Sequence, residues 1–307
     1  MKKNHKKEKK QKNIVFFIIA IVLVFLIIKY FSGNKYERNE ITNIFIDNNN
    51  ITSNINNEIK IKDDIIYMSI NDIKQFIDKT IYIEDKTDTI IMTSDKKLAS
   101  IKINEKIITV NGTKINIYCT PFEENQIIYV PISEMENVYD IDLQYNKETN
   151  IVTIDFLFNK LEKAYVSKNV KLKKENKRFS NNLEKIEKGN WIIYISEENG
   201  MAKVRTQNGN IGYIKKKYLN NFIIERENMS FEENEPEGSF LEYSIQNNDI
   251  STYEKRFKII NDIWTKAVNK DIMKVKINNS NDREGIERFK IEIIPFLKES
   301  GIYTIFN

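Results

Sequence analysis

Histidine and cysteine, which supply many catalytic and metal-binding groups, are nearly absent from this 307-residue chain. The one histidine, His5, lies in the extreme N-terminal tail, and the one cysteine is Cys119. This composition excludes Ser-His-Asp and Cys-His catalysis, most zinc sites and an intramolecular disulfide. An enzyme built from this chain would have to use carboxylates, amines or phenols, and we expect no metal and no cofactor.

Aromatic and cationic side chains occur together between residues 163 and 222. They are Tyr165, Tyr194, Tyr213 and Tyr218, with Lys215, Lys216 and Lys217. Aromatic faces and ammonium groups can form a surface that stacks on a ligand and attracts negative charge. Alternatively, the tyrosines fill a small core and the lysines form a solvated edge that discourages strand pairing. We take Tyr165, Tyr194, Tyr213, Tyr218 and Lys215 as candidate ligand-binding residues.

The N-terminus has the composition of a membrane anchor. Residues 1–13 are a basic tail, with seven Lys and one Glu in the first twelve positions, and the predicted transmembrane helix follows at 14–31. At about 1.5 Å per residue this helix spans roughly 27 Å, close to the thickness of the bilayer core. The positive-inside rule places the tail in the cytoplasm and the rest of the chain outside. A cleaved signal peptide is the alternative, although no Ala-x-Ala-like site follows the apolar stretch.

Residues 41–157 contain an internal repeat. Ile65–Ile70 matches Ile127–Ile132 at an offset of 62 residues, and later turn-and-strand segments match at the same offset. Each copy predicts a strand, a short helix, a strand, a polar turn and a strand. Asn111-Gly112 predicts a two-residue hairpin turn, because both residue types tolerate positive φ.

This duplicated unit resembles the domain named for the N-terminus of copper amine oxidases. The resemblance rests on Val110-Asn111-Gly112, Tyr129-Val130-Pro131-Ile132 and Tyr145-Asn146. It implies a non-catalytic accessory module of Gram-positive envelope proteins. The region has no His, and one Cys cannot form a copper site, so amine oxidase activity is excluded on its ligands. The first copy departs from the family in having Ser69 where Pro is usual.

Residues 163–222 predict a second all-β unit, with tight hairpins at Asn199-Gly200 and Asn208-Gly209. This unit resembles the bacterial Src-homology-3 domain, which implies binding of cell-wall peptide or glycan. The residues that carry the resemblance are Lys203-Val204-Arg205-Thr206, Asn208-Gly209, Gly212-Tyr213-Ile214 and Tyr218-Leu219. Met201 stands where the family usually has an aromatic residue.

An acidic, turn-rich linker is predicted at 225–250, before a final segment at 251–307. Ser251 and Glu254 form a predicted capping box at the start of a helix. A strand, a second helix and a last strand follow. This α–β–α–β order is that of a piece of a β/α barrel.

The final segment also resembles the middle of glycoside hydrolase family 18, particularly its envelope and spore-cortex lytic members. In that family a catalytic acid protonates the glycosidic oxygen, and an Asp two residues earlier orients the acetamido group. Asp271 matches the first position of the motif, but Lys276 replaces the orienting Asp and Asn278 replaces the acid. An amide cannot donate a proton at useful strength, and an ammonium in place of a carboxylate inverts the local charge. The loss of general acid catalysis, worth about 10²–10⁴-fold, leads us to predict no catalytic residue here. An unrelated small α/β unit is the alternative, and it also predicts no hydrolysis.

The predicted fold class is α+β and mostly β. It combines a transmembrane helix, a duplicated β-rich module, a small Src-homology-3-like barrel and a C-terminal fragment of a β/α barrel. We expect a single-pass membrane protein that faces the wall and binds peptidoglycan or another wall glycan or peptide. Two alternatives stay open: a truncated or split family 18 enzyme acting on N-acetylglucosamine-containing wall or cortex glycan, and a regulatory protein that binds another envelope protein during sporulation. Nucleic acid is not an expected partner, because the excess positive charge lies in the tail.

Overall fold

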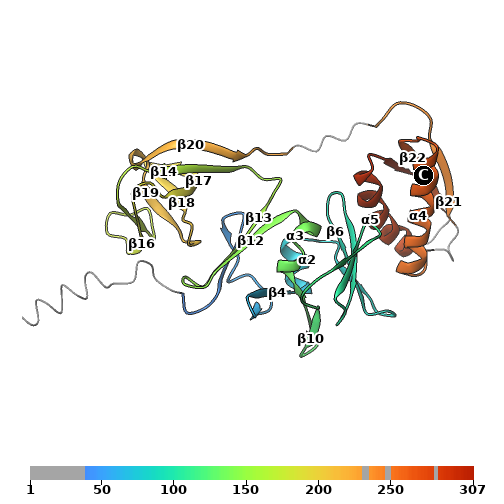
Figure 1. Cartoon of the computed structure of the whole chain (residues 1–307), viewed down its shortest axis with the longest axis horizontal. Coiled ribbons are helices and arrows are strands. Elements are labelled where there is room, and N and C mark those ends of the chain that lie inside the picture. The colour runs from blue at the N-terminus through green and yellow to red at the C-terminus, as the bar shows by residue number, and fades with distance from the viewer. Residues whose placement is uncertain (1–38, 230–234, 246–249, 280–282) are drawn as a thin grey trace, which may run out of the picture.

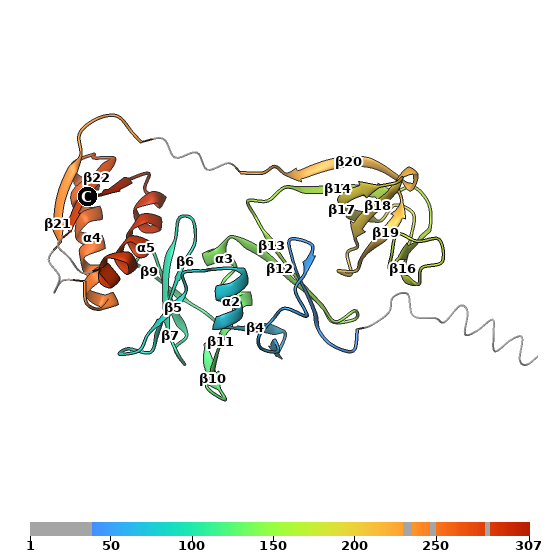
Figure 2. The same ribbon diagram turned by 180° about the vertical axis from the view of Figure 1, so that it is seen from behind.

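The computed structural model describes residues 39–229, 235–245, 250–279 and 283–307. Three units lie along the long axis of the molecule (Figures 1 and 2). A central module of repeats separates a seven-stranded unit at one end from an α/β unit at the other. The central module comes first in the sequence. The two later units pack against opposite sides of it.

The two repeats of the central module meet along equivalent strands. β4 and β11 pair in antiparallel register with Met68 opposite Val130, and these two residues are 62 positions apart. A local two-fold axis therefore passes through this pair, and the predicted offset is confirmed. The elements around the axis are β3 (Lys60–Lys62), β4 (Ile65–Ser69), α2 (Ile70–Phe76), β10 (Phe122–Glu124), β11 (Ile127–Pro131), η1 (Ile132–Glu134) and α3 (Glu136–Tyr139).

Each repeat then contributes a flanking sheet, and the two sheets are completed differently. In the first repeat a meander extends β6, whereas in the second the N-terminal strand β1 pairs in parallel with β13. The first sheet contains β5 (Tyr82–Glu84), β6 (Thr89–Thr93), β7 (Leu98–Lys102), β8 (Ile107–Val110) and β9 (Thr113–Asn116). The second contains β12 (Ile141–Asn146), β13 (Ile151–Phe156), β1 (Asn43–Ile46) and β2 (Asn49–Asn50). The hairpin predicted at Asn111-Gly112 joins β8 to β9, and both residues have positive φ.

The seven-stranded unit has the order β16-β15-β19-β18-β17-β14-β20. Its core is a separate apolar cluster that includes Ala164, Leu172, Ile192 and Val204. Its elements are β14 (Leu161–Val166), β15 (Val170–Lys173), β16 (Asn182–Ile186), β17 (Trp191–Glu198), β18 (Met201–Arg205), β19 (Ile211–Lys215), η2 (Lys216–Tyr218) and β20 (Leu219–Arg226).

The C-terminal unit has three parallel strands in the order β21-β22-β23, connected through two helices. Its elements are β21 (Leu241–Ile245), α4 (Tyr253–Asn269), β22 (Lys274–Asn279), α5 (Arg283–Glu299) and β23 (Tyr303–Phe306). β21 lies within the segment predicted as a linker. The cap of α4 is Thr252, whose hydroxyl accepts from the Lys255 amide, and not Ser251.

The predicted fold class is wrong, because the C-terminal segment is not a fragment of a β/α barrel. In such a barrel the helices cover one closed sheet and face solvent on their other side. Here α5 contacts β23 on one side and β6 and β7 of the first repeat on the other. Ile91 and Leu98 of that sheet belong to the same apolar core as Ile260, Phe289 and Leu297. The described chain is mostly β, and its two long helices are enclosed between sheets.

The predicted basic tail and transmembrane helix lie outside the described residues. Among the residues that the structure does describe, no helix combines the length and apolar character needed to cross a bilayer.

Candidate functional site

The seven-stranded unit has a groove of about 560 Å³ beside β15 and β19. Three of the five predicted ligand-binding residues line it: Tyr213, Lys215 and Tyr218. Further lining residues are Lys168, Asn169, Val170, Lys171, Lys173, Asn176, Lys177, Arg178, Asn182, Met201 and Ile214. We call this surface the cationic groove, because it contains five Lys and one Arg but no Asp or Glu.

Strand alternation explains how the groove acquires its side chains. In β15, Val170 and Leu172 are buried in the core, so Lys171 and Lys173 project from the opposite face. In β19 the buried residues are Gly212 and Ile214, which places Tyr213 and Lys215 on that face too. β15 and β19 then pair at Lys173 and Tyr213, and this pairing brings the two rows together.

Gly212 permits the close approach of these two strands. A Cβ atom at this position would lie 2.4 Å from the Lys173 carbonyl oxygen and 2.8 Å from Cγ of Leu172. Neither contact can be relieved by a flexible side-chain end, since one is backbone and the other is core. The glycine is therefore required for the geometry of the groove, and not for an unusual φ.

The cations of the groove have few acidic partners. Within the described residues, only Lys177 of the six is ion-paired, to Glu175 at 2.6 Å on the exposed rim. Nζ of Lys173 donates to the carbonyl oxygens of Lys177 and Arg178, and Lys168 lies 3.9 Å from the centroid of the Tyr218 ring. A hydrogen bond from Lys168, with the charges of Lys215 and Lys217, lowers the pKa of the Tyr218 hydroxyl. The local potential is thus positive.

The other two predicted tyrosines lie outside the groove. Tyr194 packs against the core of the unit, and its hydroxyl accepts a hydrogen bond of 3.1 Å from Nζ of Lys216. Its ring also meets Phe222 edge to face at 5.3 Å. Tyr165 is half-buried on β14, opposite Trp191 in register. The cluster predicted from sequence is therefore divided. Two tyrosines and Lys215 face the groove, whereas Tyr194 packs against the core, as the alternative interpretation expected.

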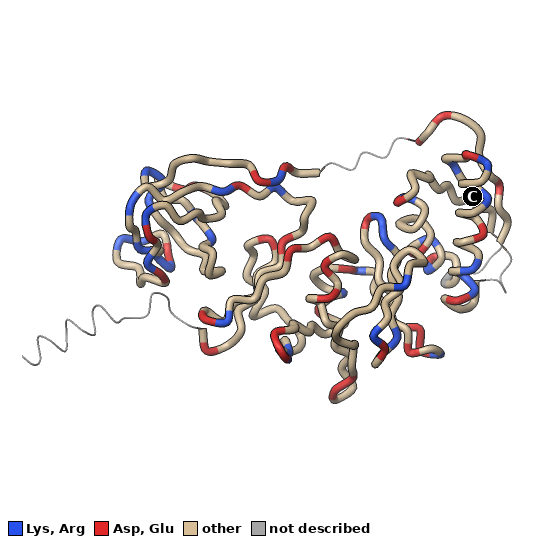
Figure 3. The backbone as a smooth tube through the Cα atoms, in the orientation of Figure 1, with Lys and Arg blue, Asp and Glu red and all other residues tan. Residues whose placement is uncertain are grey.

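Sequence reasoning missed most of the groove's cations. Residues 161–226 contain fifteen Lys and Arg against seven Glu and no Asp, a net charge of +8. The whole chain carries only +4 and the first twelve residues carry +6, so everything else carries −10. Counting charge unit by unit, and not only in the tail, identifies this unit as strongly basic (Figure 3).

Of the positions compared with a glycosidase active site, those of the orienting Asp and the catalytic acid hold no carboxylate. Asp271 is exposed in the turn after α4, whereas Lys276 and Asn278 lie on β22. Nζ of Lys276 lies 3.7 Å from the centroid of the Phe240 ring, and Oδ1 of Asn278 accepts from Nδ2 of Asn307 at 2.8 Å. These side chains are engaged in local packing, and β22 itself carries no Asp or Glu.

Glu292, a buried carboxylate of the C-terminal unit, has a structural partner. Glu292 is fully buried, and its two carboxylate oxygens share the hydrogen of Arg256 Nε, at 2.9 and 3.0 Å. Nη2 of Arg256 also contacts Glu84 at 3.2 Å and Tyr82 at 2.6 Å, both in the first repeat. Burial raises the pKa of Glu292 and the arginine opposes this shift. We call these four residues the Arg256 network, which connects the C-terminal unit to the central module.

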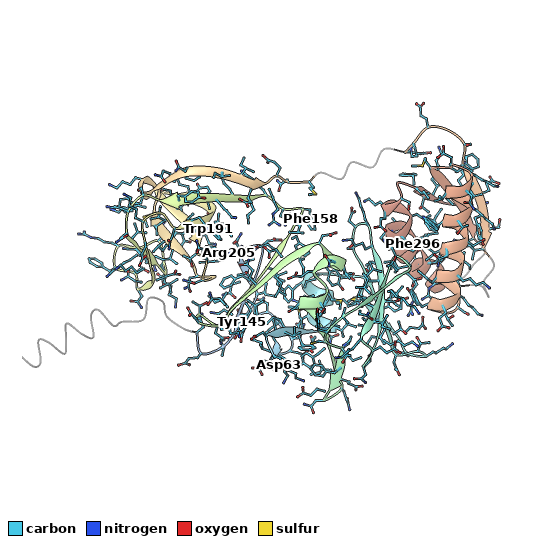
Figure 4. The ribbon with its side chains drawn as sticks, in the orientation of Figure 1. Asp63, Tyr145, Phe158, Trp191, Arg205 and Phe296 are labelled. Atoms are coloured by element: carbon cyan, nitrogen blue, oxygen red, sulfur yellow. The ribbon has the colours of Figure 1, made fainter. Side chains whose placement is uncertain are left out.

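A second hollow lies between the seven-stranded unit and the central module. It has a volume of about 150 Å³ and is lined in part by Trp191, Tyr145 and Arg205 (Figure 4). Its polar groups are largely occupied: Arg205 binds Asp155 through both terminal nitrogens, and the Tyr145 hydroxyl donates to Asn150. The cationic groove is larger, and fewer of its charged groups are ion-paired, so it is the better candidate for a ligand site.

Residues 45–154 match the family model of the copper amine oxidase N-terminal domain. This match covers the two repeats. The name of that family suggests copper, so we ask whether the side chains of the matched region could bind a copper ion. The matched region contains Cys119 but no His, and no cluster of three His, Cys, Asp or Glu suited to a metal ion occurs among the described residues. The available donors do not fit copper. No curated protein and no solved structure is significantly similar to the chain.

Proposed function

We propose that this protein is a membrane-anchored envelope protein that binds cell-wall material through its seven-stranded unit. The observation that carries the proposal is the cationic groove, where two tyrosine rings lie among six cations without an acidic lining residue. Aromatic rings offer apolar faces to sugar or peptide, and ammonium groups attract the negative charges of a wall. The resemblance of this unit to the bacterial Src-homology-3 domain supports the same function.

The remaining units serve as a support in this proposal. The apolar segment at 14–31 would hold the protein at the membrane, with the described units outside. The seven-stranded unit, which contains the groove, lies at one end of the central module, and the C-terminal unit lies at the other (Figure 1). The C-terminal unit contributes no hydrolysis, since Lys276 and Asn278 occupy the positions where a family 18 enzyme needs carboxylates.

Sedimentation with insoluble wall tests this function. The full chain, purified in mild detergent, is mixed with purified wall and centrifuged, and the bound fraction is measured. We expect binding that falls by about tenfold or more in the double variant Tyr213→Ala/Tyr218→Ala, since losing one aromatic contact costs about 0.5–1.5 kcal/mol beyond its buried area. The matched control is Tyr165→Ala, a half-buried tyrosine of the same unit outside the groove. Protein that stays in the supernatant, or equal losses in both variants, contradicts the proposal.

A further inference from the structure

The positive charge of the groove is local and does not reflect the composition of the chain. Lysine is abundant throughout, yet the parts outside the tail and residues 161–226 are net acidic by ten charges. A general enrichment in lysine codons would raise the charge everywhere. The groove therefore concentrates cations against the trend of the rest of the protein, which is the footprint of a site for a polyanion.

The strand pairing beside the groove places like charges opposite one another. β15 pairs with β16 so that Lys171 is directly across from Lys185, and both side chains are exposed. Like charges at directly opposite positions destabilise a sheet. A ligand with repeated negative charge would convert this unfavourable pair into a favourable contact, whereas a neutral glycan or peptide would leave the repulsion in place.

The spacing of the lysines indicates an anion with repeated charges. Five of the six cations of the groove are lysines, and the one arginine, Arg178, lies on the exposed loop after β15. Arginine binds both carboxylate and phosphate in a two-point fork, whereas the lysine ammonium acts as a point charge that responds to the spacing of the anions and not to their shape. Lys171 and Lys173 repeat along one face of β15, about 7 Å apart, so they can follow a chain of successive anions.

The tyrosines supply the apolar part of the same surface. Tyr213 lies between two lysines of the neighbouring strands, because it pairs with Lys173 of β15 on one side and Lys203 of β18 on the other. Tyr218 lies beneath Lys168. Alternating charge and aromatic surface fits a polymer in which phosphates alternate with carbon-rich units.

From these observations we infer that the cationic groove binds a phosphodiester-linked anionic polymer of the wall, and not the peptidoglycan strand itself. This inference rests on the proposed function, since it names the wall component that the groove recognises. Lys171, Lys173 and Lys215 contact successive phosphates, and Tyr213 and Tyr218 pack on the units between them.

The test compares intact wall with wall extracted by hydrofluoric acid, which cleaves phosphodiesters and leaves the glycan strands. We expect the full chain to bind intact wall and to bind extracted wall at least tenfold more weakly. Undiminished binding to extracted wall overturns the inference and leaves the proposed function standing. Binding to neither wall overturns the proposed function, and the inference with it.

Charge variants locate the contact on the groove. We expect Lys171→Ala/Lys215→Ala to reduce binding to intact wall by about tenfold or more, while Lys106→Ala/Lys114→Ala, which removes two exposed lysines around the β8–β9 hairpin, leaves it unchanged. Thermal unfolding confirms that each variant is folded. Equal effects of the two double variants would show that charge alone, and not this groove, governs binding.

Soluble competitors and salt test the chemistry of the anion. Inorganic polyphosphate should displace the protein from wall at lower charge concentration than polygalacturonate, and equal potency of the two would contradict the choice of phosphate. Neutralising three phosphates of a single-stranded polyanion predicts that affinity falls about 20-fold between 50 and 200 mM salt. Affinity that is independent of salt would overturn the inference.

Discussion

The two repeats of the central module share one architecture but hold their partner units in different ways. The sheet of the first repeat shares an apolar core with the C-terminal unit, and the Arg256 network is buried at that contact. The second repeat meets the seven-stranded unit mainly through polar contacts, with Arg205 bound to Asp155 and Thr149 bound to the Asn208 carbonyl. The core of the seven-stranded unit remains separate.

This difference assigns different roles to the two ends. A shared core makes the C-terminal unit part of one cooperative structure with the first repeat, since removing it would expose a sheet face. A polar junction beside a small cavity is typical of a unit that has a hydrophobic core of its own. The cationic groove belongs to this second kind of unit, where its charge and geometry can vary without disturbing the centre of the molecule.

The largest effect is expected from Arg256→Ala. This change leaves Glu292 and Glu84 buried without their cation, and breaking a buried pair in this way costs about 3–5 kcal/mol. Chemical denaturation measures the free energy of unfolding. The control is Lys266→Ala, which removes an exposed pair with Asp262 and should change stability by less than about 0.5 kcal/mol. A loss below 1 kcal/mol for Arg256→Ala would contradict the shared core.

Arg205→Ala should cost less, about 3 kcal/mol at most, because Asp155 lies beside a cavity that water can enter. The expected result is a looser junction, seen as a larger radius of gyration in solution scattering. Wall binding should persist, since the junction hollow and the cationic groove share no lining residue. Loss of wall binding would show that the two sites are not independent.

Gly212→Ala should destabilise the seven-stranded unit by about 1–3 kcal/mol, because its Cβ would overlap the Lys173 carbonyl. It should also weaken wall binding, since β15 must shift away from β19. The control is Gly200→Ala, which introduces a left-handed φ cost in a hairpin but meets no atom within 4 Å. Comparable destabilisation with unchanged wall binding is the expected behaviour of the control. Normal wall binding by Gly212→Ala would contradict the role of this contact.

The smallest expected effect is an increase in stability. Lys171→Ala removes the repulsion with Lys185 and should raise stability by about 0.2–1 kcal/mol at low salt. Thermal unfolding at 20 and 500 mM salt measures it, and the gain should shrink as salt screens the charges. A variant that is less stable than the parent at low salt would show that the lysine pair carries no cost.

Local patterns in the sequence predicted the parts of the fold that depend on local interactions. The 62-residue offset was visible because each repeat has the same order of apolar and polar residues, and the structure places Met68 opposite Val130. The hairpins at Asn111-Gly112 and Asn199-Gly200 followed from residues that tolerate positive φ. The C-terminal unit could not be predicted in this way. An α–β–α–β order does not specify what covers the helices, and the covering strands β6 and β7 lie far away in sequence.

The site was predicted in part for the same reason. Tyr213, Tyr218 and Lys215 were selected from their residue types and their neighbourhood in sequence. Lys171 and Lys173 were missed because β15 was not recognised as a strand, so the outward row of lysines had no face to lie on. Their meeting with β19 depends on a pairing across forty residues and on the absence of a side chain at Gly212.

Lysine footprinting on intact wall tests the central claim most directly. The full chain is labelled with an amine-reactive ester, free and wall-bound, and modification at each lysine is measured by mass spectrometry. We predict strong protection of Lys171, Lys173 and Lys215 and unchanged labelling of Lys114 and Lys258, which are exposed on other units. Protection of Lys114 and Lys258 with continued labelling of the groove lysines would contradict the account.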